Sequence, residues 1–186
     1  MPGRLSIEQT EQLEEWIDTG PKRFKLLYSI TSDGCDAAQF HKMCDNEGPT
    51  VTVLYNPQGS VYGGYTSISW QVAGRWKRDD KAFLFQLAFS NKKLFRKFPS
   101  NKTDTIVRHF PSDGPCFGAG YDLKVLYGSI QPVYGVFPFA KNGGKMQPSD
   151  SFVYNGVTAA DINNGTMDVV EVEVYGFIGK CAEDLG

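Results

Sequence analysis

The chain has 186 residues, of which 41% are hydrophobic and 22% are charged, and its formal net charge is −2. This length and composition predict a soluble globular protein whose core needs neither disulfides nor metals to hold it. They exclude a membrane-spanning helix, because no apolar run approaches the roughly 18 residues that such a helix needs. No secretory leader opens the chain, so we expect a cytoplasmic protein.

The first predicted element is an amphipathic helix within residues 1–20. Ser6 and Gln9 have the spacing of a capping box, in which each side chain binds the backbone N–H of the other. Leu13 lies on the apolar stripe of this helix, and a Gly-Pro pair ends it. We therefore expect the helix to pack on a main domain that covers residues 21–186.

Strands dominate after one further helix. A buried strand is predicted over 24–30 and a helix within 32–49. Further strands are predicted at 50–56, 61–70, 82–89, 105–110, 121–127, 133–139, 151–154 and 169–178. Two early helices followed by many strands predict an α+β domain with a β-sandwich core.

The last predicted strand contains the alternating stretch VVEVEVY. Its valines alternate with Glu171, Glu173 and Tyr175, a pattern typical of a half-buried strand. Glu171 and Glu173 point to one face and could share a partner, but a solvent-exposed face is favoured. Asp79 and Asp80 form another close acidic pair, but neither pair is joined by clustered imidazoles or thiols, so we predict neither a metal site nor a bound cofactor.

Charge is distributed unevenly along the chain. Residues 72–108 carry ten Lys and Arg against three Asp and Glu, a net of +7, and the remainder carries nine against eighteen, a net of −9. A basic segment of this kind can bind an acidic partner. Its candidate contacts lie in the run KKLFRKF: Lys92, Lys93, Arg96 and Lys97.

Two alternatives exist for this basic run. Cations interleaved with aromatic residues can bind nucleic acid or anionic lipid. Lysines also protect exposed edge strands from aggregation. The protective role is favoured, and no nucleic-acid partner is expected, because the chain has no second basic and aromatic run.

The four cysteines show neither CxxC nor zinc spacing, so small apolar residues with reduced thiols are favoured. Two of them are nevertheless redox candidates. Cys44 lies one helical turn after His41, whose imidazole could lower the thiol pKa, and Cys116 lies in a glycine-rich turn. A thiol-based redox protein is therefore an alternative to a binding module. The sequence pairs no nucleophile with a general base, so no catalytic residue is predicted.

The strand VYGGYTSISW, residues 61–70, places three hydroxyl groups beside aromatic residues. These belong to Thr66, Ser67 and Ser69, and no catalytic base accompanies them. The Gly63-Gly64 pair predicts either the close approach of a neighbouring backbone or helix, or a bulge.

Several segments in order resemble the TLDc domain over about residues 21–178. They are FKLLYSITSDGCDAAQFHKMCDNEGPTVTVLYNPQGSVYGGYTSISW, AFLFQLAF, GPCFGAGYDLKV and VVEVEVYGF. The stretches LEEWIDTGPKRFKLLY and INNGTMDVVEVEVYGF are similar to the interferon-induced protein 44 family in particular.

The resemblance implies a two-sheet antiparallel β-sandwich with a few flanking helices and no established catalytic centre. It implies a non-enzymatic protein-interaction module in antiviral innate immunity, where a GTPase-like region follows the module and would carry any GTP binding. The wider family implies protection from oxidative stress and binding to the vacuolar proton pump (vacuolar ATPase). Stress-protection members have a Gly-Thr-Gly-Glu stretch where this chain has KRDDK, so Asp79 or Asp80 stands nearest to that acid.

Overall fold

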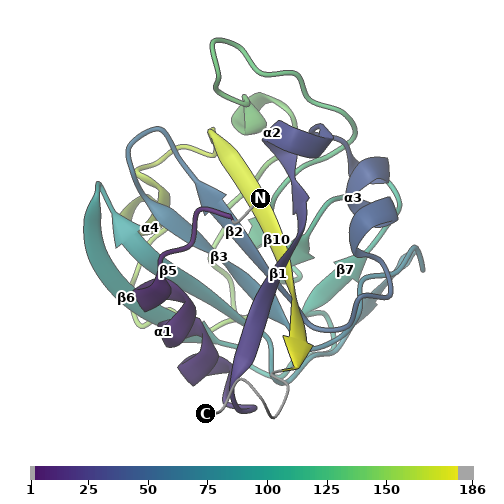
Figure 1. The fold of residues 1–186 in the computed structure, drawn as a ribbon, viewed down its shortest axis with the longest axis vertical. Helices are drawn as coiled ribbons and strands as arrows, with labels where there is room; N and C mark the ends of the chain where they lie inside the picture. The colour runs from purple at the N-terminus through teal and green to yellow at the C-terminus, as the bar shows by residue number, and fades with distance from the viewer. Residues whose placement is uncertain (1–2, 180–186) are drawn as a thin grey trace.

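The computed structural model describes residues 3–179 and contains two antiparallel sheets with short helices around them (Figure 1). The larger sheet has the strand order β1-β10-β2-β3-β5-β6, and the smaller has the order β4-β7-β8-β9. The larger sheet consists of β1 (Lys22–Ser29), β2 (Thr50–Tyr55), β3 (Val61–Thr66), β5 (Phe83–Phe89), β6 (Lys92–Pro99) and β10 (Glu171–Gly179). The smaller consists of β4 (Arg75–Lys77), β7 (Val107–His109), β8 (Cys116–Phe117) and β9 (Leu123–Lys124). The predicted α+β fold with two antiparallel sheets is confirmed.

The helices are short apart from the first. They are α1 (Ile7–Ile17), α2 (Ile30–Asp33), α3 (Ala37–Cys44), α4 (Ala160–Asn163) and the 3-10 helix η1 (Phe139–Lys141). No helix in residues 3–179 is long and apolar enough to cross a membrane.

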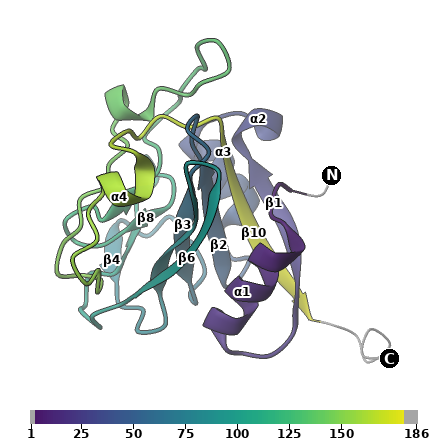
Figure 2. The ribbon, with the colours of Figure 1, turned by 90° about the vertical axis from the view of Figure 1, so that its left-hand side faces the viewer.

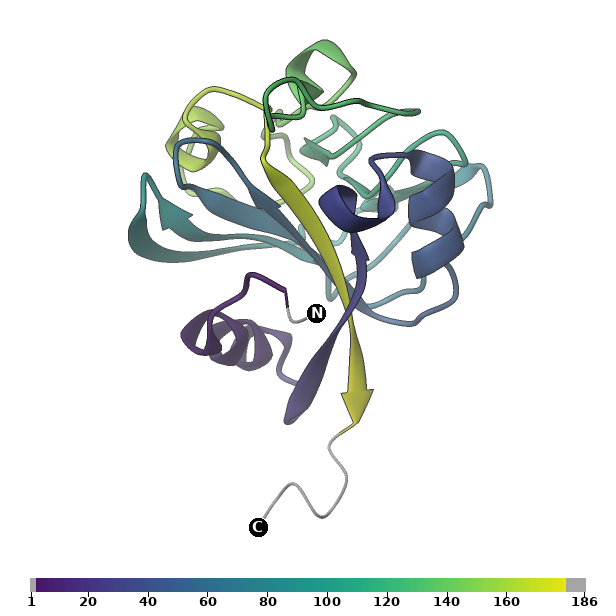
Figure 3. The same cartoon turned by 45° about the horizontal axis from the view of Figure 1, so that its top comes forward.

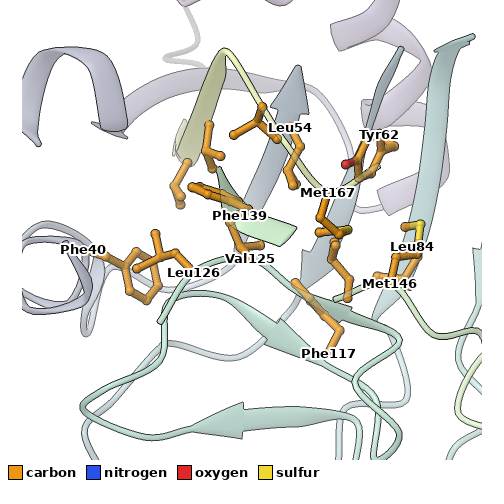
Figure 4. Packing of buried hydrophobic residues seen from close by; sticks show 14 of the residues in the cluster. Phe40, Leu54, Tyr62, Leu84, Phe117, Val125, Leu126, Phe139, Met146 and Met167 are labelled. Atoms are coloured by element: carbon orange, nitrogen blue, oxygen red, sulfur yellow. The ribbon is translucent and has the colours of Figure 1, made fainter. Parts of the chain in front are cut away.

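The larger sheet is the middle layer of the domain. Helix α1 packs on one of its faces, and the smaller sheet with its loops packs on the other (Figures 2 and 3). Leu13 of α1 contributes to one core cluster together with Val53 and Phe85 of the sheet. The second cluster joins the two sheets through residues such as Leu84 and Phe117 (Figure 4). Both faces of the larger sheet are therefore buried.

Helix α1 begins as predicted. The Ser6 hydroxyl accepts from the Gln9 N–H at 3.1 Å, and the Gln9 amide oxygen accepts from the Ser6 N–H at 3.0 Å. The helix ends at Ile17, before the Gly-Pro pair, because Asp18 adopts a left-handed conformation with φ 54°. The local capping signals were thus sufficient to place the start of this helix.

The helix predicted within 32–49 is present as α3, but it begins only at Ala37, and the first residues of the range belong to a separate helix, α2. Gly34, with φ +94°, separates α2 from α3. Helix α3 then begins at its own cap, where the Asp36 carboxylate accepts from the Gln39 N–H at 3.1 Å. Cys35 lies between the two helices and Cys44 ends the second, and both are buried free thiols.

Some predicted strands are shorter or absent. Strand β3 ends at Thr66, four residues before the predicted end, and residues 121–127 contribute only the two residues of β9. Residues 133–139 contain two isolated bridges, Val133 with Val136 and Phe137 with Val169, and the start of η1. Residues 151–154 form a single bridge at Phe152. The segment 133–139 follows Pro132 and contains Pro138, and a proline has no N–H to donate to a ladder.

Strand β10 is not half-buried, which corrects the prediction made from its alternating pattern. Glu171 is 3% exposed and Glu173 is 2% exposed. The strand lies between β1 and β2 in the middle layer, so both of its faces are covered (Figure 1). An alternating pattern reports the polarity of the side chains, and here the polar face is buried too.

These two glutamates bond to β10 itself and to other segments of the chain. Glu173 accepts from the Arg4 N–H at 2.9 Å and from the hydroxyls of Tyr55 and Tyr175. Glu171 accepts from the Ser29 hydroxyl at 3.1 Å and lies 3.7 Å from the Arg4 guanidinium. Burial raises the pKa of the Glu173 carboxyl, whereas the bonds from its partners lower it. The acidic face of β10 therefore fastens the segment that leads into α1.

Gly63 lies where neighbouring backbone comes close, as the glycine pair predicted. A Cβ at this position would lie 1.8 Å from the carbonyl oxygen of Thr52 in β2. Next to it, a Cβ on Gly64 would lie 2.8 Å from the ring of Phe117, which belongs to the smaller sheet. The pair thus permits both strand pairing and the approach of the two sheets.

We expect Gly63→Ala to lower the free energy of unfolding by about 3 kcal/mol, because a backbone atom cannot move aside as a side chain can. Gly179→Ala is the matched control, since Gly179 also lies in a strand and has no neighbouring atom within 4 Å of the added Cβ. Urea unfolding of both variants measures the difference. Equal stability of the two variants would contradict the packing assigned to Gly63.

Candidate functional site

The four cations predicted as a basic face lie on β6, at an edge of the larger sheet, and two of them contact α1. Lys93 forms an ion pair with Glu8, with both side chains more than half exposed. Lys97 donates to the Trp16 carbonyl at 3.0 Å and lies 4.8 Å from the centre of the Phe83 ring. These lysines therefore help to hold α1 on the sheet.

The other two cations have different surroundings. Arg96 donates to the Gln86 amide oxygen at 3.4 Å. The amide nitrogen of Gln86 in turn donates to the Asp161 carbonyl in α4 at 2.9 Å, on the side of the sheet away from α1. Lys92 is exposed near the beginning of the strand. The structure therefore does not gather the four cations into one cluster.

The basic segment 72–108 supplies an edge strand to each sheet. Strand β4 is an edge of the smaller sheet and carries Arg75 and Lys77, while β6 is an edge of the larger sheet. Positive charge on edge strands opposes pairing with other chains. This arrangement fits the protective role that the sequence favoured.

The two redox candidates are fully buried. Cys44 and Cys116 are both 0% exposed. Burial raises the pKa of the Cys44 thiol far above its usual range, and burial followed by the nearby Asp113 raises the pKa of Cys116 to about 12. Because the thiolate is the reactive form, neither environment favours thiol chemistry.

His41 does not bond to Cys44. Its Nδ1 lies 2.8 Å from an Asp45 carboxylate oxygen, and its Nε2 lies 2.9 Å from the carbonyl oxygens of Phe110 and Asp113. The imidazole therefore links α3 to the loop before β8, and its contacts account for its position without a catalytic role.

The hydroxyls after β3 form a clamp around one carboxylate. Asp79 accepts from the Thr66 hydroxyl at 2.7 Å, the Ser67 hydroxyl at 2.6 Å and the Ser67 N–H at 2.7 Å. It also accepts from the Lys81 N–H at 3.1 Å. The third hydroxyl, that of Ser69, accepts from the Gly48 N–H at 2.9 Å. These groups close a loop, and Asp79 has its acceptor sites filled.

A hollow of about 650 Å³ opens beside this clamp. Lys22, Tyr65 and Lys81 are among the residues that line it, and Asp79 forms part of its wall. Asp80, also on the wall, lies 2.7 Å from Arg78 as an exposed ion pair. The hollow has a mixed charged and apolar lining but no paired acid and base.

His109 is buried and neutral. Its Nδ1 accepts from the Gln71 N–H at 3.0 Å, and its ring lies 5.3 Å from that of Trp70. Burial and then the charge of Lys77 lower the pKa of His109 to about 4. Within residues 3–179, no group of three or more His, Cys, Asp and Glu side chains could hold a metal ion.

A cluster around Asp113 was not predicted from the sequence. The Asp113 carboxylate is 1% exposed and lies 2.9 Å from Arg108 Nε and 3.2 Å from Lys124 Nζ. Aromatic rings surround both cations. The contributing residues are separated along the chain, so no local motif joins them.

We expect the thiols of residues 35, 44 and 116 to resist iodoacetamide in the folded protein and to react after unfolding in urea. Cys181 lies outside the described residues, so the measurement uses a Cys181→Ser background. Mass spectrometry of the native and unfolded protein counts the labelled thiols. Rapid native labelling of Cys44 or Cys116 at neutral pH would support the thiol alternative instead.

The free energy of unfolding should fall as the pH is lowered from 6.5 to about 4. In this window the His109 imidazole gains a proton in the unfolded chain, whereas it stays neutral in the folded protein. The contribution is up to about 1.4 kcal/mol per pH unit, or roughly 3 kcal/mol in total. Urea unfolding at several pH values should give a flatter dependence for His109→Asn, and an unchanged slope would contradict the assignment.

Comparison with known proteins extends over almost the whole described chain. The sequence model of the TLDc domain matches residues 5–178. A chicken (Gallus gallus) protein named MTOR-associated protein MEAK7 is 26% identical over 167 residues, which cover 88% of this chain and 34% of that protein. The mouse (Mus musculus) protein of the same name is 34% identical over 67 residues, covering 36% of this chain and 15% of its own length.

The chain thus spans about a third of the length of the chicken relative. The human (Homo sapiens) protein of that name matches a similar short stretch, 34% identical over 65 residues. The family match, in contrast, runs from the segment before α1 to the end of β10 and includes both sheets. The chain belongs to the TLDc domain family.

Proposed function

We propose that this chain is a non-catalytic protein-interaction module of the TLDc type. One observation carries the proposal: within residues 3–179, the groups most suited to chemistry are used to hold the fold. The Asp79 carboxylate accepts hydrogen bonds from hydroxyls and N–H groups, and the His41 imidazole joins α3 to the loop before β8. The Cys44 thiol is buried. What remains for function is the surface of a rigid sandwich.

A protein partner is supported by the relatives. The similar chicken and mouse proteins are named as MTOR-associated, which describes an association with another protein. We extend such an association to this chain, with mTOR-containing complexes as the first partner to test.

Resemblance to two groups of TLDc proteins supports more specific proposals for the cellular role. Similarity to the interferon-induced protein 44 family favours a cytoplasmic role in antiviral innate immunity. The wider family favours protection from oxidative stress or binding to the vacuolar proton pump. The burial of Cys44 and Cys116 argues against a thiol mechanism for such protection.

The experiment is affinity capture with the whole chain as bait and immunological detection of mTOR. Two charge-reversal variants separate binding from folding. Lys92→Glu leaves the contacts of α1 and of Gln86 in place, whereas Lys93→Glu with Lys97→Glu removes contacts to Glu8 and the Trp16 carbonyl.

If the β6 edge is the docking surface, Lys92→Glu should reduce capture by about fivefold while the thermal midpoint stays close to that of the unchanged chain. Lys93→Glu with Lys97→Glu should lower the midpoint as well. A folded bait that captures no mTOR would contradict the proposed partner. Equal capture by all variants would remove β6 as the surface.

A further inference from the structure

The outer face of the smaller sheet carries a row of aromatic and cationic side chains. Trp76 in β4 pairs with Arg108 in β7, and Lys124 in β9 forms a bridge with Lys145. All four are at least partly exposed, whereas their strand neighbours such as Val107 and Leu123 are buried. Because successive residues of a strand point to opposite faces, the row lies on the side away from the core.

Aromatic rings hold the cations of this row in place. The Arg108 guanidinium lies 4.1 Å from the centre of the Phe110 ring and 5.3 Å from that of Tyr121. Lys124 and Lys145 each lie 5.2 Å from the Tyr121 ring. Such contacts are attractive and restrict long side chains that would otherwise be mobile. We call Arg108, Tyr121, Lys124 and Lys145 the Tyr121 surface.

The buried carboxylate of Asp113 compensates only part of the positive charge of the Tyr121 surface. Three cations surround Tyr121, and Asp113 is the carboxylate that pairs with two of them. The third cation, Lys145, is exposed. Counting these four groups, the surface keeps a net charge of +2. Tyr127 lies beside Lys124, with 4.8 Å from its ring centre to the ammonium, and is 52% exposed.

These features fit carboxylates better than nucleobases. The guanidinium of Arg108 is stacked on Phe110, and two lysines contact Tyr121, so cations already occupy the ring faces on which a base would stack. The Nε of this guanidinium faces Asp113 and one terminal nitrogen donates to the Tyr121 hydroxyl, which leaves the other terminal nitrogen for a carboxylate. The chain as a whole has a net charge of −2, which opposes a long polyanion.

We propose that the Tyr121 surface docks an acidic segment of a partner protein. The carboxylates of the segment bind Arg108, Lys124 and Lys145, and an apolar residue of the segment packs on Tyr127. This inference rests on the proposed function as an interaction module and adds a place and a partner chemistry to it. It assigns binding to the smaller sheet and not to the β6 edge.

The test measures binding of a fluorescein-labelled peptide, Glu-Glu-Val-Glu-Glu-Val-Glu-Glu, to the whole chain by fluorescence anisotropy. The same peptide with Gln in place of Glu is the uncharged comparison. Lys145→Glu probes the surface, because the Lys145 side chain is exposed and the bridge to Lys124 uses its backbone. Lys92→Glu is the matched control, with the same charge change on an exposed residue of β6.

We expect the acidic peptide to bind and the Gln peptide not to bind. Lys145→Glu should weaken binding by about three- to tenfold, and Lys92→Glu should leave it within about twofold. Tyr127→Ala should weaken it as well, and raising the salt from 50 to 300 mM should reduce it. Equal losses in Lys145→Glu and Lys92→Glu, or no binding at all, would overturn the proposal.

A fluorescein-labelled single-stranded oligonucleotide in the same assay tests whether the surface binds nucleic acid instead of an acidic peptide. Tighter binding of the oligonucleotide than of the peptide, with the same loss in Lys145→Glu, would overturn the assignment to an acidic protein segment. Capture of mTOR together with a failure of the peptide to bind would refute only this inference and leave the proposed function standing.

Discussion

The larger sheet lies between α1 and the smaller sheet, and this burial of both faces constrains the polar groups on its central strands. A buried polar group without a partner costs free energy, so bonding within the protein is favoured, although the hydroxyls of Thr52 and Tyr62 have no hydrogen-bond partner. Glu173 bonds in this way with the Arg4 N–H and the Tyr55 and Tyr175 hydroxyls. The sheet therefore fixes the position of the segment before α1 through hydrogen bonds as well as through the apolar contacts of Leu13.

The same constraint explains the state of the groups that could have been catalytic. His109 is neutral because burial penalises its charged form, and its one bond places it against the loop that follows Trp70. The Asp79 carboxylate lies beside the end of β3 and accepts hydrogen bonds from the Thr66 and Ser67 hydroxyls. In both cases the side chain stabilises a connection between layers. On the outer surfaces, the β6 cations Lys93 and Lys97 contact α1, whereas the cations of the Tyr121 surface contact aromatic rings.

Local patterns predicted the elements whose causes are local. The capping box of Ser6 and Gln9 lies within one helical turn, and its bonds formed as expected. The break at Gly34 was missed because apolar spacing continued across it. The exposed face predicted for Glu171 and Glu173 failed for a different reason. Their partner Arg4 is about 170 residues away in the chain, so the strand itself contains no sign of burial.

The sequence by itself determined the α+β class, the start of α1, most strands of the larger sheet and the resemblance to TLDc domains. These follow from capping, periodicity and segment order, all of which are properties of short stretches. Only the tertiary structure decided that β10 is central, that the β6 cations divide between α1 and the opposite side of the sheet, and that Arg108, Tyr121, Lys124 and Lys145 meet. Such meetings depend on strand order and register, which join residues that are distant along the chain and leave no periodic pattern within it.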